Sequence, residues 1–302
     1  MDKNLPVDKN ISVVDSINGN TKIVGVFGFP VSHTMSPLLQ NTMSKHFNEN
    51  IVYVPFEVDP DKLEDAVKGI KALGAMGFNV TIPHKESIKR HLNWISPEVV
   101  AAGSVNTVKI VDGMLKGYST DGRGFTESLY METGLRVQYK TICVFGAGGS
   151  TRSIVYQCAI EGANEICIIN RTLEKAESIA QKISTISDCL CIALPANSDD
   201  AKTFIEKSDI IINTSAMGMK PYEDLSPLSN DIKLSEEQIV YDIVYTPRKT
   251  NLIKQAELAG CMAINGMGML FMQGVFSYEI WTGLFPDKDS LNKYYKWFCH
   301  ID

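Results

Sequence analysis

The chain has 302 residues, of which 44% are apolar and 21% are charged, values typical of a soluble globular protein and not of a disordered or fibrous one. This length favours two domains over one, because a domain commonly contains roughly 100–200 residues. The formal net charge is −6 and no run rich in Lys or Arg occurs, so we expect neither nucleic acid nor an anionic membrane surface as a partner.

The chain begins with a polar stretch, MDKNLPVDKN, that lacks the apolar segment of a signal peptide, and we expect residues 1–20 to form a polar extension. The longest apolar stretch, residues 23–31, is too short to span a membrane. The seven cysteines form no CxxC pair, which is typical of reduced thiols in a cytoplasmic protein. The five histidines include no HExxH motif, so no metal site is expected.

From residue 21 to about 111, short apolar runs alternate with longer amphipathic ones. This pattern is typical of βα units and of a largely parallel sheet. We expect strands in TKIVGVF, IVYVPFE and MGFNV, and a helix over residues 61–73. Ser36 is expected to cap a helix that begins at Pro37, because both residue types suit the unpaired N–H groups of a helix start. Asp112-Gly113 predicts a tight hairpin turn and hence one antiparallel pair.

A second series of βα units begins at Thr141. Its expected strands are TICVFG, EICIIN, CLCIAL, DIIINT and IVYDIV. The residues from Gly266 onward are expected to be mostly helical and to return to the first domain. We therefore predict one domain from residues 21–121 with 266–302, and another from residues 122–265.

The strand TICVFG leads directly into the turn Gly146-Ala147-Gly148-Gly149-Ser150, which an apolar helix follows. Glycines permit a tight turn and let the backbone approach a pyrophosphate, which then rests on the helix N-terminus. Thr151 stands where the third glycine of GxGxxG would be, and a glycine-rich turn alone is also compatible with an ordinary strand-to-helix connection.

The tip of the next strand reads Asn170-Arg171-Thr172, and Asn170 lies 24 residues after Gly146. A carboxylate here would hold the ribose 2′-hydroxyl of NAD, but none is present. A guanidinium flanked by amide and hydroxyl donors instead suits a 2′-phosphate. The sequence therefore predicts a Rossmann-like domain that binds NADP, with an ordinary exposed arginine as the alternative.

Two further segments follow strands of the first domain, where open α/β sheets bind their ligands. One is NVTIPHK, which contains Thr81 and Lys85, and the other is Ser119-Thr120-Asp121. Hydride transfer to a carbonyl builds negative charge on oxygen, which needs a cation or proton donor, and the reverse reaction needs a base. Lys85 and Asp121 could supply both functions, although two isolated charged residues could equally be surface groups.

Seven motifs of this chain, in the same order, resemble the shikimate dehydrogenase family: NVTIPHKE, AGSVNT, STDGRGF, GAGGSTR, NRT, DIVYTP and NGMGMLFMQG. The resemblance spans nearly the whole chain from Gly28 onward. It implies an α/β fold, with an N-terminal, mostly parallel substrate domain and a Rossmann-like NADP-binding domain. It also implies the reversible NADPH-dependent reduction of 3-dehydroshikimate to shikimate, on the route to chorismate and the aromatic amino acids, in a cleft between the domains.

The resemblance assigns roles to particular residues. Lys85 and Asp121 match the catalytic pair of the family. The implied substrate contacts carry mainly hydroxyl and amide groups, and they are Thr34, Ser36, Thr81, Asn106, Asp121, Tyr245 and Gln273. The implied cofactor contacts are the glycine turn from Gly146 to Ser150, the tip formed by Asn170, Arg171 and Thr172, and Ile243 and Gly266 near the nicotinamide.

The chain departs from the family pattern at three places. The family usually has Ser at position 34, Asn at position 119, and Thr-Pro-Val/Leu-Gly-Met where Ser215 to Met219 occur. Thr34 adds a methyl group near the expected substrate carboxylate, which bears on the choice between shikimate and quinate. We predict shikimate with NADP. A quinate/shikimate dehydrogenase using NAD or NADP, and a non-catalytic sensor of these compounds, remain as alternatives, and both a monomer and a homodimer are compatible with the sequence.

Tyr245 and Lys249 match the Tyr-x-x-x-Lys pattern of short-chain dehydrogenases. Pro247 lies between them, and proline fits the first turn of a helix but not its interior. We therefore expect Tyr245 to lie before the helix, so that the two side chains need not share one face.

Overall fold

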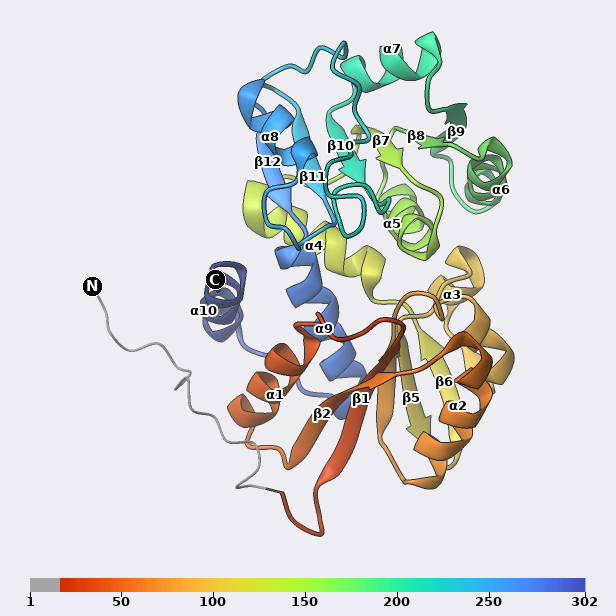
Figure 1. Ribbon diagram of the computed structural model, residues 1–302, viewed down its shortest axis with the longest axis vertical. Coiled ribbons are helices and arrows are strands. Elements are labelled where there is room, and N and C mark those ends of the chain that lie inside the picture. Colours follow the sequence, from red (N-terminus) through yellow and green to blue (C-terminus); the bar gives the residue numbers. More distant parts are fainter. Residues whose placement is uncertain (1–16, 302) are drawn as a thin grey trace, which may run out of the picture. The chain divides into compact units, whose positions relative to one another are not determined.

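The structure is a computed structural model that describes residues 17–301, and it divides into two compact units (Figure 1). Unit 1 contains the residues up to 100 together with 104–120 and those from 270 onward, and unit 2 contains residues 101–103 and 121–269. The expected polar extension falls largely on residues 1–16, which lie outside the described residues. The structure divides the chain after residues 120 and 269, whereas the sequence analysis placed the divisions after 121 and 265.

Unit 1 is built on a six-stranded sheet with the order β2-β1-β3-β5-β6-β4. The strands are β1 (Lys22–Gly28), β2 (Ile51–Glu57), β3 (Gly77–Val80), β4 (Trp94–Ile95), β5 (Thr107–Val111) and β6 (Met114–Tyr118). Strand β1 is parallel to β2 and β3, and β4 is parallel to β6, whereas β5 is antiparallel to β3 and β6. The expected hairpin is confirmed: Asp112 and Gly113 have φ values of 51° and 71°, the left-handed conformation that a tight two-residue turn requires.

Helical segments cover both faces of this sheet. They are α1 (Ser36–His46), η2 (Pro60–Lys62), α2 (Leu63–Ala72), η3 (Ser87–His91), α3 (Pro97–Ala102), α9 (Met267–Thr282) and α10 (Lys288–Cys299). Helix α2 buries Leu63, Val67 and Ile70 in a core that also contains Phe27 and Phe78 of the sheet. On the opposite face, Trp281 of α9 packs against side chains of β1 and β2 and donates a hydrogen bond to the Val108 carbonyl at 3.0 Å.

The expected capping role of Ser36 is wrong by one position. Helix α1 begins at Ser36 itself, Met35 is the capping residue, and Met35 makes no side-chain capping bond. The Ser36 N–H donates to the Thr34 hydroxyl at 3.2 Å, so Thr34 accepts from the first N–H of the helix in place of a Ser36 cap. Pro37 lies in the first turn, as expected.

Unit 2 is built on a six-stranded parallel sheet with the order β12-β11-β10-β7-β8-β9. Its strands are β7 (Thr141–Phe145), β8 (Glu165–Asn170), β9 (Leu190–Pro195), β10 (Ile210–Asn213), β11 (Ile239–Asp242) and β12 (Met262–Asn265). Strand β12 was not expected, because its segment MAIN is only four residues long. The strand order reverses between β7 and β10, and ligands of such sheets bind at that switch point.

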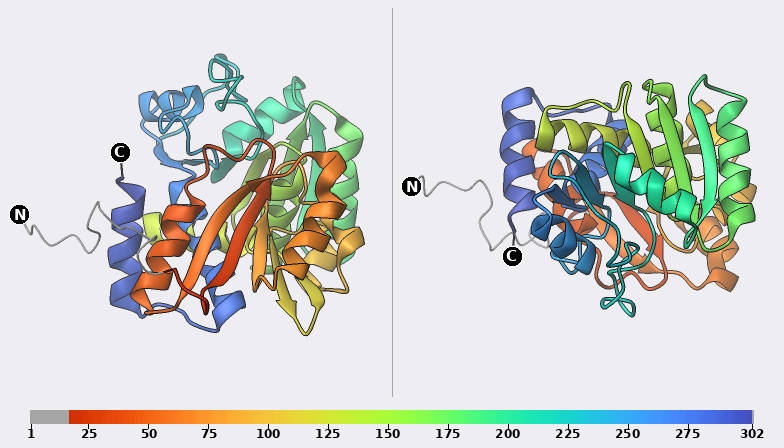
Figure 2. Two further views of the ribbon diagram at one scale, coloured as in Figure 1. Left: turned by 60° about the horizontal axis from the view of Figure 1, so that its bottom comes forward. Right: turned by 90° about the horizontal axis from the view of Figure 1, so that it is seen from above.

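Two layers of helices enclose the sheet of unit 2 (Figure 2). Helices α4 (Asp121–Thr133), α5 (Gly149–Ile160) and α6 (Leu173–Ser184) pack on one face, and α7 (Asp199–Lys207) and α8 (Asn251–Leu258) pack on the other. Because both faces are covered, the strands are almost continuously apolar, with Ile210, Ile211 and Ile212 all fully buried. None of the helices described is long and apolar enough to span a membrane.

Six cysteines are buried, and all six belong to unit 2. Burial raises the pKa of the Cys167 and Cys191 thiols to about 12, so both stay protonated at neutral pH. Within residues 17–301, no group of three His, Cys, Asp or Glu side chains is arranged to hold a metal ion.

Gly77 provides a test of the packing in unit 1. A Cβ atom at this position would lie 2.2 Å from the Val108 carbonyl oxygen and 2.5 Å from the Trp281 indole nitrogen. We expect Gly77→Ala to lower the free energy of unfolding by about 1–3 kcal/mol, measured by urea denaturation, because β5 or Trp281 must shift. Gly69→Ala is the control, since its Cβ meets nothing within 4 Å on α2 and should stabilise the helix by about 0.5–1 kcal/mol. Equal effects of the two substitutions would contradict the packing described.

Candidate active site

The predicted substrate residues of unit 1 gather at one edge of its sheet. Strands β1 and β3 are parallel, and Thr34 and Thr81 follow their carboxyl ends. Asn106 precedes β5, which runs in the opposite direction, so that the start of β5 lies at this same edge. Thr120 follows β6, which is antiparallel to β5 and therefore ends there too. We call this edge the carboxyl edge of unit 1.

Lys85 lies in the turn that follows β3 at this carboxyl edge. The Lys85 carbonyl accepts a hydrogen bond from the Val105 N–H at 2.9 Å, and the His84 N–H donates to the Thr81 carbonyl at 2.8 Å. The buried His84 ring contacts the Val58 carbonyl through Nε2 at 2.7 Å, which fastens the turn to the end of β2. The backbone that carries the half-buried Lys85 side chain is therefore held from three directions.

Asn106 and Gln273 are 167 residues apart in the sequence, and the structure brings their side chains together. The Asn106 Nδ2 donates to Gln273 Oε1 at 3.1 Å and to Thr120 Oγ1 at 2.7 Å. The Thr120 N–H donates back to Asn106 Oδ1 at 2.9 Å, and its hydroxyl donates to the Gln273 carbonyl at 2.9 Å. These bonds fix which way the Asn106 amide points.

A buried polar cluster beneath the carboxyl edge was missed by the sequence analysis. It contains Tyr53 of β2, Asn79 of β3, Thr107 of β5 and Ser277 of α9. The Asn79 Nδ2 donates to the Ser277 hydroxyl at 3.0 Å and to the Asn106 carbonyl at 2.9 Å. The available signal was an asparagine within the apolar strand GFNV, because a buried amide needs partners.

In unit 2 the glycine turn lies at the switch point of the sheet, between the ends of β7 and β10. Gly146 has a φ of 106°, and a Cβ there would lie 2.8 Å from the Thr214 hydroxyl. Gly148 is the N-terminal capping residue of α5, and its N–H donates to Thr151 Oγ1 at 3.0 Å. Thr151, the departure from GxGxxG, also bonds Thr214 Oγ1 at 2.7 Å and so joins the turn to the end of β10.

The geometry of this turn fits a dinucleotide. A Cβ built on Gly148 meets nothing within 4 Å, so there is open space beside the start of α5. Ala147, Gly149 and Ser150 complete the turn and are partly exposed. The start of a 12-residue helix presents backbone N–H groups and the positive end of its dipole, which together attract phosphate.

The tip that follows β8 also lies at the carboxyl ends of the strands in unit 2. The Asn170 Nδ2 donates to the Thr172 carbonyl at 2.8 Å, and Thr172 caps α6 without a side-chain capping bond. Arg171 between them is exposed. Lys175 is exposed in the first turn of α6 and adds a second cation that the sequence analysis did not single out.

The ends of β10 and β11 are joined by a buried carboxylate, Asp242, which the sequence analysis also missed. Asp242 Oδ1 accepts from Asn213 Nδ2 at 2.9 Å and from the Val244 N–H at 3.0 Å, and Oδ2 accepts from the Thr250 hydroxyl at 2.6 Å. Burial raises the pKa of Asp242 to about 6, although its hydrogen bonds act in the opposite direction. The signal in the sequence was an aspartate that ends the apolar strand IVYD.

Two predicted nicotinamide contacts, Ile243 and Gly266, lie next to each other in unit 2. A Cβ on Gly266 would lie 2.0 Å from the Ile243 carbonyl oxygen, so only glycine allows this approach. Tyr245 follows Ile243 in the same segment, and burial raises the pKa of its phenol. Asp121 is the first residue of α4 and is buried.

Tyr245 and Lys249 do not share a helical face, which removes the structural basis of the short-chain dehydrogenase alternative. Helix α8 begins at Asn251 and is capped by the Thr250 hydroxyl, so both residues precede it. Pro247 was expected in the first helical turn, but it too lies before the helix because the chain first has to reach the Thr250 cap.

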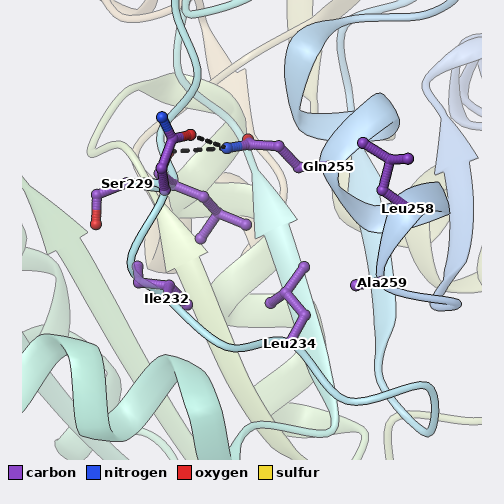
Figure 3. Close-up of a pocket in the computed structure, with 8 residues that line it drawn as sticks. Ser229, Ile232, Leu234, Gln255, Leu258 and Ala259 are labelled. Carbon is purple, nitrogen blue, oxygen red and sulfur yellow. Dashed lines mark hydrogen bonds between the residues drawn. The ribbon is translucent and has the colours of Figure 1, made fainter.

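A groove of about 290 Å³ lies between α8 and the segment 228–234 of unit 2 (Figure 3). Leucine, isoleucine and alanine side chains form most of its wall. Its Gln255 amide is already engaged with Asn230 Oδ1 at 3.1 Å and with the Leu228 carbonyl at 3.4 Å. The groove contains none of the predicted site residues, so we do not assign the active site to it.

The fold and the glycine turn define the class of this protein: a two-unit α/β protein with a Rossmann-like, dinucleotide-binding sheet. Two sequence profiles of one family match the chain, that of the shikimate dehydrogenase substrate binding domain over residues 26–108 and that of shikimate / quinate 5-dehydrogenase over residues 130–264. The chain belongs to the shikimate dehydrogenase family. The resemblance drawn from its motifs is thereby confirmed.

Relatives and solved structures of this family match most of the chain. A shikimate dehydrogenase (NADP(+)) of Alkaliphilus metalliredigens is 43% identical over 268 residues, which cover 88% of this chain and 93% of the relative. That of Methanocaldococcus jannaschii is 41% identical and covers 90% of this chain and 95% of the relative. The structure of the Listeria monocytogenes shikimate 5-dehydrogenase in complex with shikimate and NAD has a TM-score of 0.84 at 36% identity, covering 92% of this chain and 97% of that one.

Asp242 predicts a pH dependence of stability. Its pKa of about 6 in the folded state lies above the ordinary value of 3.8, so between about pH 4 and 6 the folded protein binds more protons than the unfolded one. The contribution of Asp242 to stability is therefore lost as the pH rises through this window. The non-titrating variant Asp242→Asn should gain about 3 kcal/mol relative to wild type between pH 4 and pH 7.

Urea denaturation of both proteins at several pH values measures this difference. Asp231→Asn is the control, because Asp231 is exposed and its pKa is lowered to about 2 by Lys202 and Ser229, which places its titration below the window. Parallel stability curves for Asp242→Asn and wild type from pH 4 to 7 would rule out the raised pKa.

Proposed function

We propose that this protein is an NADP-dependent shikimate dehydrogenase, which reversibly reduces 3-dehydroshikimate to shikimate. The observation that carries the proposal is the gathering of the predicted substrate residues at the carboxyl edge of unit 1, in a chain whose curated relatives at 37–43% identity are shikimate dehydrogenases (NADP(+)). The reaction belongs to the formation of chorismate and the aromatic amino acids. The acidic composition and the reduced cysteines support a cytoplasmic enzyme, acting as a monomer or a homodimer.

In this proposal unit 1 holds the substrate. Its ring hydroxyls and carboxylate meet side chains with hydroxyl and amide groups, which can donate and accept hydrogen bonds. These side chains are Thr34, Ser36, Thr81, Asn106 and Gln273, together with Tyr245 of unit 2. A site of this kind rejects an analogue whose hydroxyl is missing, because its own buried polar groups would be left without partners.

Unit 2 holds the cofactor. The glycine turn and the start of α5 accept the pyrophosphate, and Arg171 with its neighbours Asn170 and Thr172 receives the 2′-phosphate. Ile243 and Gly266 would contact the nicotinamide. NADPH supplies the hydride when it is bound.

Lys85 and Asp121 carry the proton chemistry. As hydride reaches the carbonyl carbon, negative charge develops on the carbonyl oxygen. The Lys85 ammonium stabilises this charge and donates the proton, and in the reverse direction the Lys85 amine accepts it. The Asp121 carboxylate accepts a hydrogen bond from a substrate hydroxyl.

Initial rates with the four combinations of shikimate or quinate with NADP or NAD test this function. We expect the highest kcat/KM for shikimate with NADP. A higher kcat/KM for quinate or for NAD would instead assign a quinate/shikimate dehydrogenase, for which Thr34 is the residue to examine. Binding of shikimate in calorimetry without any NADPH absorbance would reveal a sensor and overturn the proposal.

The same assay on Lys85→Ala tests the catalytic assignment. Loss of the proton donor should lower kcat by about 10²–10⁴-fold while shikimate still binds. Lys89→Ala, four residues further along in η3, is the matched control and should keep the kcat of wild type. Near-normal turnover of Lys85→Ala would show that the assignment is wrong.

Arg171→Asp tests the cofactor preference. Replacing the guanidinium by a carboxylate should raise the KM for NADP about 10- to 100-fold and leave the KM for NAD within a few-fold, since one charged hydrogen-bond partner is lost. Lys254→Asp makes a similar change of charge at an exposed position of α8 and should alter neither the KM for NADP nor the KM for NAD. An unchanged KM for NADP in Arg171→Asp would refute the role of this residue.

A further inference from the structure

We propose that Tyr53 is a positioning residue of the substrate site, whose hydroxyl holds the Asn79 amide and through it orients Asn106, one of the groups that bind the substrate. The proposal rests on the proposed function, because Asn106 is a substrate contact only in that function. It adds a residue that the motifs do not contain, since Tyr53 lies within β2 and away from every motif that carries the resemblance.

Tyr53 is held in place independently of its hydroxyl. Its side chain is 1% exposed, and its ring packs beside Trp281 with the ring centroids 6.1 Å apart. Its backbone N–H donates to Asn41 Oδ1 at 2.8 Å, and Asn41 Nδ2 donates to its carbonyl at 3.1 Å. Asn41 belongs to α1, the helix that begins at Ser36, so α1 is fastened to β2 next to the phenol. Removal of the hydroxyl alone should therefore leave the ring in place.

The direction of the hydrogen bond between Tyr53 and Asn79 can be worked out. Asn79 Nδ2 donates to the Asn106 carbonyl, so Asn79 Oδ1 must be the atom that faces Tyr53. The Tyr53 hydroxyl donates its single proton to this oxygen at 2.8 Å. Tyr53 thus fixes which way the Asn79 amide points, and with it the donor that holds the Asn106 carbonyl.

The same chain of bonds continues to the other substrate contacts. Thr107 Oγ1 receives a hydrogen bond from Asn79 Nδ2 at 3.1 Å and donates to Asn106 Oδ1 at 3.0 Å. Asn106 in turn holds Gln273. One buried network therefore connects β2 and β3 with the start of β5 and with α9, the two elements that present Asn106 and Gln273.

Tyr53 does not act as an acid or base in this proposal. Burial raises its pKa far above the usual range of a tyrosine, so the phenol stays protonated at any working pH. The members of the network named above, from Tyr53 to Gln273, carry only hydroxyl and amide groups. Tyr53 must therefore affect the substrate by orienting the residues that bind it. The pH profile of kcat should not depend on the Tyr53 hydroxyl.

Tyr53→Phe in the full chain tests the proposal. We expect the KM for shikimate to rise about 3- to 10-fold, the size of one lost hydrogen bond, with the KM for NADP and the pH profile of kcat unchanged. Tyr278→Phe is the matched control: it is a 1% exposed tyrosine of α9 in the same unit, and its buried hydroxyl makes no hydrogen bond to the network. Equal KM values for shikimate in the two variants would overturn the proposal.

A double-mutant cycle with Asn79→Ser separates positioning from a general loss of stability. If Tyr53 acts through Asn79, adding Tyr53→Phe to Asn79→Ser should raise the KM for shikimate by less than twofold more. A full additional increase would contradict the proposal. Should Tyr53→Phe fail to fold, Asn79→Ser removes the oxygen that accepts from Tyr53, and it should raise the same KM.

The wild-type assay separates this proposal from the proposed function. If wild type turns over shikimate with NADP and Tyr53→Phe matches it, only the role of Tyr53 is wrong. If wild type shows no turnover, the proposed function fails. The dissociation constant of shikimate from calorimetry, compared between wild type and Tyr53→Phe, then decides the role of Tyr53 by the same expected increase.

Discussion

The arrangement of the carboxyl edge of unit 1 depends on the hydrogen bonds of the Asn106 side chain. Its amide donates to Thr120 and Gln273 and accepts from the Thr120 backbone, so both ends of the amide are in use. A carboxylic acid or an apolar residue of similar size could not do this, because only an amide offers donors and an acceptor side by side. The bond to Gln273 also explains how a helix from the end of the chain becomes part of a site begun by the first three strands.

At the ends of the strands in unit 2, the side chains of threonines and of one carboxylate make the hydrogen bonds that hold the loops. Parallel strands end at one edge, where backbone groups have lost their neighbours in the sheet. The Thr214 hydroxyl donates to the Phe145 carbonyl at 2.6 Å, and the Asp242 carboxylate accepts hydrogen bonds from the side chains of Asn213 and Thr250. The loops that would face the cofactor are thus shaped by side chains at the strand ends, and the glycines then leave room for the ligand.

Local patterns predicted much of this fold. Apolar runs identified five of the six strands of unit 2, and Asp112-Gly113 identified the hairpin, because each depends on neighbours in the sequence. Strand β12 and the Tyr53 cluster were missed, since their roles depend on partners distant along the chain: Tyr53 and Asn79 are 26 residues apart, and Asn79 and Ser277 are 198 apart. Motifs likewise indicated Lys85 and Arg171, whereas the role of Asp242 could be recognised only from its three hydrogen-bond partners in the structure.

The two units differ in the number of their cysteines and in how far these are buried. Six buried thiols lie in unit 2, whereas the remaining one, Cys299, lies partly exposed on α10 of unit 1. A thiol reagent therefore reaches the buried six only when unit 2 opens, and each opening event exposes several reactive groups at once. The number of modified cysteines per molecule, followed by mass spectrometry, would thus report the opening of the cofactor unit separately from that of its neighbour, without any label being introduced.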